Sequence, residues 1–134
     1  MAFAARGHVV NLAKSIYADV LVLSPEGRLD HDNCAAFHSA LERYLEEPGS
    51  TAARGVVFDL GSLDYVSSAG LRCFMLAAKQ ARAHGGKILI AAMQPVVAEI
   101  FEISRFSMIL EAFPTVRAAL ESLSPESALA YDRA

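Results

Sequence analysis

The chain of 134 residues is 54% apolar and 20% charged, and its formal net charge is −3. This composition excludes an intrinsically disordered chain, and the length fits one domain with a sizeable hydrophobic core. A nucleic-acid partner is not expected, because such a partner requires a basic surface. No apolar run approaches the ~20 residues of a membrane-spanning helix, and the N-terminus shows no secretory signal pattern. We therefore expect a cytoplasmic protein without direct membrane insertion.

Apolar residues recur with the spacings of strands and helices along the chain. In chain order, they predict strands at 9–12 and 20–23, a helix at about 34–45, a strand at 56–60, a helix at 68–84, a strand at 88–92, a helix from Pro95, a weak strand at 108–110 and a helix from about 113 to 123. Strands that alternate with helices indicate an α/β fold with a mixed, mostly parallel central sheet of four or five strands and about four helices. We expect this single domain to span 1–123 and residues 124–134 to form a flexible C-terminal tail.

Polar residues and glycines mark the expected connections. Lys14, Ser15 and Asp19 are expected to form the turn between the first two strands, and Gly27 to end the second. The segment 61–66 is expected to be a loop. The two strands on either side of the second predicted helix should be parallel and adjacent, because a single helix connects them.

The two cysteines, Cys34 and Cys73, lie inside predicted helices, and nothing suggests a disulfide framework. Cys34 shares its helix face with Phe37 and is interpreted as a core residue. His31, Cys34 and His38 have the i, i+3, i+7 spacing of a helix face, but one helix cannot close a tetrahedral site and no fourth ligand is apparent. The sequence therefore predicts no metal and no other cofactor.

The serine pair Ser67–Ser68 stands at the start of the second predicted helix. A serine there can cap the helix, and the backbone amides and helix dipole also favour a phosphate at that position. Catalysis by the serine is not expected: His84 lies some ~24 Å along the helix from Ser68, and Asp59 and Asp64 are poor bases without a histidine. The nucleophile elbow and the phosphate-binding loop are both absent, so we expect a protein that is not an enzyme.

The second predicted helix is apolar on more than its sheet-facing side. Cys73, Leu76 and Ala77 form an apolar flank beside the main face. Neighbouring helices could cover this flank. Alternatively, the flank could be a docking surface beside the serine pair, bordered by Arg72 and Lys79.

Several segments together resemble one known family over roughly residues 9–123. They are the turn Gly27-Arg28-Leu29-Asp30, the run VVFDLGSLDYVSSAGLRCFMLAAKQARAHGGKILIA, the Pro95 helix before EISRF, and the ending FPTVRAAL. In order and spacing they resemble the STAS domain in its stand-alone form, the bacterial anti-sigma factor antagonist.

This resemblance implies a binding switch controlled by phosphorylation. The unphosphorylated protein would bind an anti-sigma factor, a serine kinase of the histidine-kinase ATPase fold, and so free a sigma factor. The kinase would phosphorylate a serine at the start of the second helix, and the complex would then dissociate. A metal-dependent serine phosphatase would restore the first state.

The resemblance also implies the site residues. The family pattern of aspartate, serine, serine or threonine, then Gly-Leu, aligned on Gly70-Leu71, places the phosphoacceptor at Ser68, with Ser67 as the second choice. Ser67 stands where the family has an aspartate. The implied partner-binding residues are Asp30, Asp64, Tyr65, Val66, Ser67, Ser68, Ala69, Gly70, Arg72, Cys73 and Leu76.

Two other functions stay open on the sequence alone. One is an accessory subunit of a lipid or anion transport complex, with the same fold and no phosphorylation; the other is a small ligand- or nucleotide-binding domain. The retained Ser68 favours the phosphorylation switch, whereas the replaced aspartate mildly favours the accessory subunit. A weak homodimer is a further open alternative.

Overall fold

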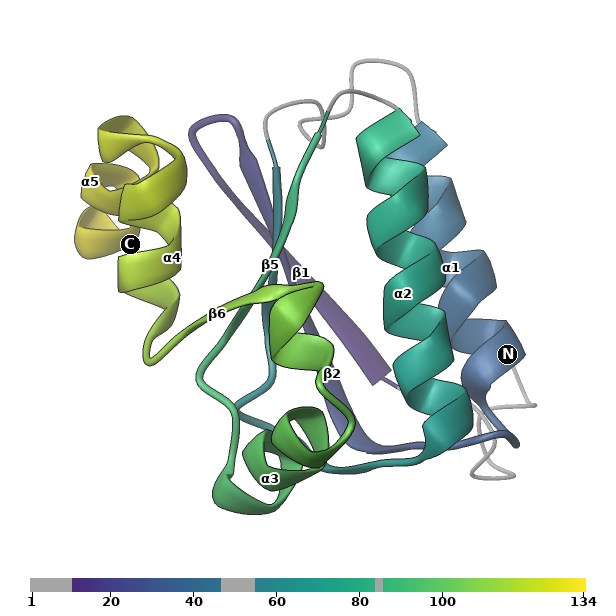
Figure 1. Ribbon diagram of the computed structural model, residues 1–134. Helices are drawn as coiled ribbons and strands as arrows, with labels where there is room; N and C mark the ends of the chain where they lie inside the picture. The colour runs from purple at the N-terminus through teal and green to yellow at the C-terminus, as the bar shows by residue number, and fades with distance from the viewer. Residues whose placement is uncertain (1–10, 47–54, 84–85) are drawn as a thin grey trace.

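A computed structural model describes residues 11–46, 55–83 and 86–134. A twisted sheet separates two helical layers, as Figure 1 shows. The strands are β1 (Asn11–Tyr17), β2 (Val20–Leu29), β3 (Val56–Asp59), β4 (Leu63–Val66), β5 (Ile88–Ala91) and β6 (Glu111–Phe113). The helices are α1 (Cys34–Glu46), α2 (Ser68–Ala83), α3 (Pro95–Ile103), α4 (Val116–Leu123) and α5 (Pro125–Arg133), with a short 3-10 helix, η3 (Phe106–Met108).

The sheet has the order β1-β2-β3-β5-β6, and β4 pairs with the end of β2. β1 is antiparallel to β2, and the other pairs are parallel. The predicted α/β class and mixed, mostly parallel sheet are therefore confirmed. The predicted adjacency of the strands that flank α2 is also confirmed, since Val57 of β3 lies opposite Leu89 of β5. The described residues form six strands and five α-helices, one more of each than expected.

The hairpin of β1 and β2 differs from the expected one. Lys14 and Ser15 do not form a turn but pair with β2, because β1 is an edge strand whose polar side chains reach solvent. The turn is made by Ala18 and Asp19, with Ala18 at φ 57°. Gly27 does not end β2 either. Its φ of 87° accompanies a register shift, after which β2 continues to pair with β4. Of the first predicted strand, 9–12, residues 9 and 10 lie outside the described residues.

Three further expectations are wrong. Residues 63–66, expected in a loop, form β4, because the end of β2 offers them a parallel partner. The weak strand expected at 108–110 begins only at Glu111, after η3. Residues 125–133, expected in a tail, form α5, which packs against α4 and β1, with the rings of Tyr17 and Tyr131 5.2 Å apart.

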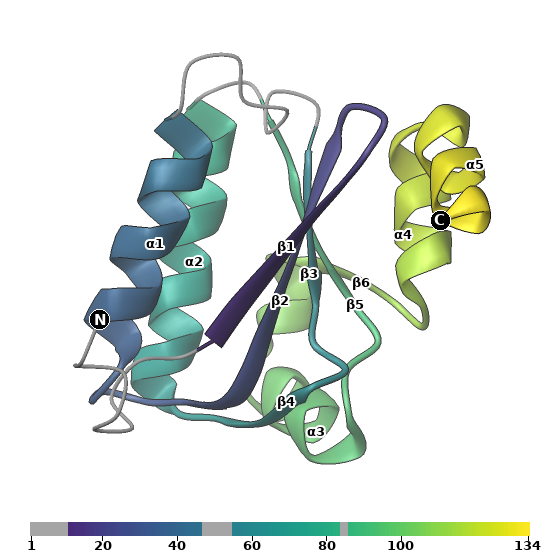
Figure 2. The ribbon, with the colours of Figure 1, turned by 180° about the vertical axis from the view of Figure 1, so that it is seen from behind.

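Each face of the sheet buries its own apolar cluster, because side chains alternate along a strand. On one face, Phe58 of β3 packs against Phe37 of α1 and Phe74 of α2, with ring centroids 5.1 to 5.8 Å apart. On the other face, Val57 and Leu89 pack under α4 and α5. Figure 2 shows these helix pairs on opposite sides of the sheet. The helical layer of α1 and α2 thus brings the serine pair to one end of the sheet.

Candidate functional site

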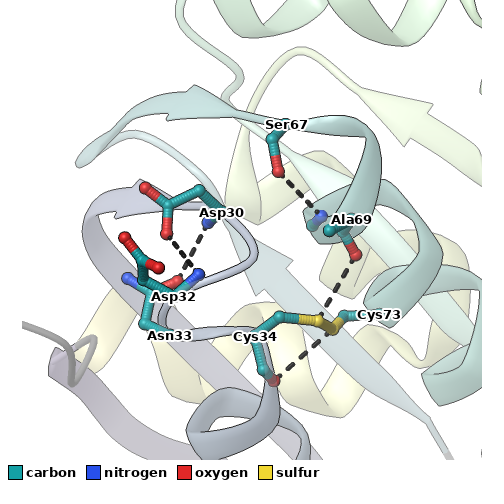
Figure 3. The surroundings of a disulfide bond; sticks show 8 residues. Asp30, Asp32, Asn33, Cys34, Ser67, Ala69 and Cys73 are labelled. Carbon is teal, nitrogen blue, oxygen red and sulfur yellow. Dashed lines mark hydrogen bonds between the residues drawn. A yellow bond between two sulfur atoms is a disulfide. The ribbon is translucent and has the colours of Figure 1, made fainter.

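The serine pair lies where β4 runs into α2, beside the end of β2. Figure 3 shows Ser67 at this junction. The Ser67 backbone N–H donates to the Leu29 carbonyl oxygen at 2.8 Å, which attaches this turn to β2. The Ser67 Oγ accepts a hydrogen bond from the Gly70 N–H at 3.2 Å. Ser67 is therefore the N-cap residue of α2, and its hydroxyl satisfies one of the unpaired amides of the first turn.

Ser68 is the first residue of α2, and its side chain is exposed. Within the described residues, its hydroxyl makes no hydrogen bond. On the sequence alone either serine could begin the helix, and a capping role was expected for Ser68; this expectation is wrong, because the structure assigns the cap to Ser67. The two neighbouring hydroxyls consequently differ: one is engaged with the backbone, whereas the other faces solvent at the positive end of the helix dipole.

Gly70 allows α2 to approach β2 this closely. A Cβ atom at this position would lie 2.7 Å from the Leu29 carbonyl oxygen and 2.7 Å from the Val66 Cγ2. The first contact involves backbone, which cannot move aside easily, so a glycine is required here. In the sequence Gly70 aligned the serines and was an implied partner-binding residue, but its packing against β2 could not be predicted.

A polar cluster lies at the same end of the sheet, across β2 and β4. Arg28 and Tyr65 are paired in register, and the Arg28 guanidinium lies 4.5 Å from the centre of the Tyr65 ring. The Arg28 Nε is also 3.7 Å from the Asp30 Oδ2. The structure thus brings the predicted residues Asp30 and Tyr65 together through Arg28, which was not predicted as a site residue although it lies inside the quoted turn.

Asp64 belongs to a second polar contact, with the start of α3. The Gln94 Nε2 donates to the Asp64 Oδ1 at 3.3 Å and to the Gly61 carbonyl oxygen at 2.9 Å. Gln94 is the N-cap residue of α3, so these bonds hold α3 against the segment that leads into β4. No local sequence pattern could have identified Gln94.

Not every predicted partner-binding residue is accessible. Val66, Gly70 and Cys73 are buried, so their side chains can only position the others. The predicted apolar flank of α2 is likewise mostly covered, because Cys73 and Ala77 are 2% and 0% exposed whereas Leu76 is 38% exposed. The remaining predicted residues are exposed or partly exposed, and they are Asp30, Asp64, Tyr65, Ser67, Ser68, Ala69, Arg72 and Leu76.

The expectation that the cysteines are unpaired is wrong. Cys34, the first residue of α1, forms a disulfide with Cys73 in α2, and their Cα atoms are 6.4 Å apart (Figure 3). The partners are separated by 39 residues. A sequence cannot show that the two helices pack side by side with these positions facing, so the pairing had no local signal.

The described residues contain no group of three or more side chains suited to a metal ion. His31 precedes α1, and its Nε2 lies 3.1 Å from the Asp32 Oδ1. Across the same described ranges, no helix is both long and apolar enough to cross a membrane. His84, which the sequence placed too far from Ser68 to act as its base, lies outside the described residues.

Comparisons with known proteins agree with the fold and the resemblance. A family model described as the STAS domain matches residues 11–119. A Bordetella bronchiseptica protein, BtrV, which bears the name of a candidate anti-sigma factor antagonist, is 47% identical over 74 residues. The match covers 55% of this chain and 61% of BtrV, so it spans less than two thirds of that relative.

Two solved structures share the fold. An anti-sigma factor antagonist from Mycobacterium paratuberculosis has a TM-score of 0.76 and 17% identity, over 87% of this chain and 95% of that one. The Bacillus cell fate determinant SpoIIAA, in its phosphorylated form, has a TM-score of 0.61 and 15% identity, over 85% of this chain and 98% of that one. With a family model that matches most of its length and the same fold, this chain belongs to the STAS domain family.

Proposed function

We propose that the protein is an anti-sigma factor antagonist whose binding is switched off by phosphorylation of Ser68. The name of its relative BtrV supports the first part of the proposal, and the phosphorylated form of SpoIIAA supports the second. The assignment to Ser68 rests on the different environments of the two serine hydroxyls. Ser67 caps α2 with its hydroxyl, whereas the Ser68 hydroxyl is exposed and has no hydrogen-bond partner among the described residues.

The cap also accounts for the departure from the family pattern at Ser67. Aspartate and serine are both strong N-cap residues, because each offers a side-chain oxygen to the amides of the first turn. A serine in the aspartate position therefore keeps the capping bond to the Gly70 N–H while it removes a charge. This replacement leaves Ser68 in the position of a phosphoacceptor.

A phosphate on Ser68 should act at the interface and leave the fold intact. It adds about −1.5 to −2 charges at neutral pH, and the amides and dipole at the start of α2 favour an anion. In a complex, the same charge would be desolvated or placed against acidic groups of the partner. Phosphorylation thus blocks docking rather than changing the shape of the domain.

The proposed partners follow from this switch. The protein binds an anti-sigma factor that is a serine kinase of the histidine-kinase ATPase fold, and a metal-dependent serine phosphatase removes the phosphate. The protein is not itself an enzyme, because no histidine among the described residues is hydrogen-bonded to Ser68, and it acts in the cytoplasm. Purified protein should hydrolyse neither esters nor ATP in a way that depends on Ser68.

The test replaces Ser68 by aspartate. Binding of Ser68→Asp to the cognate anti-sigma kinase should weaken more than ~100-fold, which corresponds to ~3 kcal/mol, while its free energy of unfolding stays within ~0.5 kcal/mol of the wild type. Ser68→Ala is the matched control and should bind as the wild type does, since it carries no charge. Binding can be measured by calorimetry and stability by urea denaturation.

The position of the phosphate provides a second measurement. After incubation with the kinase and ATP, mass spectrometry should locate the phosphate on Ser68 and not on Ser67. A phosphate on Ser67 alone, or normal binding by Ser68→Asp, would show that Ser68 is not the switch. A protein that neither binds the kinase nor becomes phosphorylated would favour the accessory subunit of a transport complex.

A further inference from the structure

The disulfide joins two segments of the proposed switch. Cys34 follows Asn33, whose Nδ2 donates to the Arg28 carbonyl oxygen at 2.7 Å and whose Oδ1 accepts from the Asp30 N–H at 2.9 Å. Cys73 lies in the second turn of α2, beyond the serine pair. The covalent bond therefore ties the turn between β2 and α1 to the beginning of α2, as Figure 3 shows.

Both sulfur atoms also lie against backbone carbonyl groups. The Cys34 Sγ is 3.3 Å from the Ala69 carbonyl oxygen, and the Cys73 Sγ is 3.4 Å from the Cys34 carbonyl oxygen. A disulfide has no hydrogen to donate, but a thiol at either position would find an acceptor within reach. The reduced protein can thus satisfy both thiols without rearranging the two helices.

The surroundings also allow the bond to form and break. Cys34 is partly exposed, whereas Cys73 is 2% exposed. An oxidant in solution would reach the Cys34 sulfur first, with the buried Cys73 thiol beside it as the resolving group. In a reducing compartment, glutathione and thioredoxin keep most protein thiols reduced. A disulfide that forms there is therefore usually transient, and such pairs often act as redox sensors.

We propose that Cys34 and Cys73 are a reversible redox pair that restrains the first turn of α2 and thereby slows phosphorylation of Ser68; the effect on phosphorylation rests on the proposed function. Hydrogen peroxide transfers a hydroxyl group to the Cys34 thiolate, its O–O bond breaks, and the products are the sulfenic acid and hydroxide, which takes a proton from solvent to become water. The Cys73 thiol then attacks that sulfur: the S–S bond forms, the S–O bond breaks, and the hydroxyl group leaves as water with the proton of the Cys73 thiol. A dithiol reductant reverses the reaction and becomes a disulfide itself.

The crosslink acts where Ser68 must move. Phosphoryl transfer requires the Ser68 Oγ to lie in line with the phosphate that the kinase transfers from ATP. We expect the first turn of α2 to open locally so that the Oγ can reach this position. That turn is already held by the bond from the Ser67 N–H to the Leu29 carbonyl oxygen. A covalent link one turn further on makes opening rarer, because it removes the freedom of α2 to separate from α1.

The first arm of the test needs no kinase. The wild-type protein is oxidised with hydrogen peroxide or reduced with dithiothreitol, and its thiols are counted by alkylation and mass spectrometry. Peroxide should produce an intrachain disulfide that dithiothreitol removes from the folded protein. Amide hydrogen exchange in the first turn of α2 should be ~10-fold slower in the oxidised form. Thiols that stay free after peroxide, or equal exchange in the two forms, would overturn the proposal.

The second arm measures phosphorylation of Ser68 by the cognate kinase. The oxidised wild type should react several-fold more slowly than the reduced form. The double variant Cys34→Ala/Cys73→Ala should react at the reduced rate in both conditions, since the chain has two cysteines in all. Cys34→Ala and Cys73→Ala cannot form the intrachain disulfide, so a slower rate after peroxide in either single variant would point to oxidative damage elsewhere in the protein. Equal phosphorylation rates for the oxidised and reduced wild type would overturn the effect of the disulfide on phosphorylation. No phosphorylation in either form would refute the proposed function. The redox pair would then be judged by the hydrogen-exchange measurement alone.

Discussion

The helices α2 and α5 begin with the same capping bond but differ in exposure. The Ser67 Oγ accepts from the Gly70 N–H at 3.2 Å, and the Ser124 Oγ accepts from the Ser127 N–H at 3.1 Å. Each serine stands three residues before the amide it satisfies. However, Ser67 is partly exposed, whereas Ser124 is 2% exposed and packs between α4 and α5.

The residue that follows each cap makes the functional difference. α2 continues with the exposed Ser68, whereas α5 continues with Pro125, which has neither a hydroxyl nor an amide hydrogen. The Ser127 hydroxyl is 0% exposed and donates to the Leu120 carbonyl oxygen at 2.9 Å. Both serines at the start of α5 are therefore structural, whereas α2 has an exposed second hydroxyl, which is the position that we propose for phosphorylation.

The largest effect on stability is expected at Gly70. In Gly70→Ala the new Cβ would overlap the Leu29 carbonyl oxygen at 2.7 Å. Overpacking of this kind costs up to ~3 kcal/mol, and the helix preference of alanine offsets up to ~1 kcal/mol. The free energy of unfolding should fall by ~2 kcal/mol, as measured by urea denaturation.

Ala118 provides the matched control, because it occupies the same position after the cap of α4. The Thr115 Oγ1 accepts from the Ala118 N–H at 3.1 Å, and the Ala118 side chain is only partly buried. Ala118→Gly removes the atom that Gly70→Ala adds, and should cost ~1 kcal/mol through helix preference alone. If Gly70→Ala were neutral or stabilising, the close approach of α2 to β2 would be wrong.

The sequence was sufficient for the parts of the fold that local patterns determine. The buried runs of β3 and β5 and the start of α3 at Pro95 follow from apolar spacing and a helix-start residue. β4 has only four residues, and its pairing with β2 includes a register shift between Gly27 and Arg28, for which the sequence has no local signal. α5 depends on packing against α4 and β1, which no window of sequence contains.

The candidate site divides in the same way. The sequence located the serine pair at a helix start, because capping is a local signal. It could not assign the cap, since that depends on the bond that attaches the Ser67 N–H to β2. The pairing of Cys34 with Cys73 and the contact of Arg28 with Tyr65 join different elements, so only the fold brings them together.

A smaller effect is expected when each capping hydroxyl is removed. Ser124→Ala should cost ~1.5 kcal/mol, because it removes a buried capping bond and leaves the Ser127 N–H with the Ser124 carbonyl oxygen, 3.2 Å away, as its acceptor. Ser67→Ala should cost ~1 kcal/mol, because water can replace the lost bond. Ser68→Ala should cost less than ~0.5 kcal/mol, since its hydroxyl is exposed. Urea denaturation of the three variants gives the ranking. If Ser68→Ala lowered the free energy of unfolding more than Ser67→Ala, the assignment of the cap to Ser67 would be wrong.

The smallest effect concerns the ion pair that joins α4 to α5. The Arg117 Nε lies 3.0 Å from the Asp132 Oδ1, and the hydrogen bonds from Arg117 lower the pKa of Asp132 below its ordinary value of 3.8. A lowered carboxyl pKa gives stability that is present above pH 3.8 and is lost as the pH falls through the lower folded value. Both side chains are substantially exposed, so the contribution to stability is small.

An NMR titration of the Asp132 carboxyl group can test this ion pair directly. Arg117→Ala should return the pKa of Asp132 towards 3.8, whereas Glu121→Gln should move it less, because Glu121 contacts the Arg117 Nη1 at 3.3 Å and leaves the bonds to Asp132 in place. We expect no matching effect of these variants at the start of α2, because its cap is a neutral hydroxyl that does not titrate. An unchanged Asp132 titration in Arg117→Ala would contradict this ion pair and leave apolar packing, the Ser124 cap and the bond from the Ser127 hydroxyl to the Leu120 carbonyl oxygen to join α5 to α4.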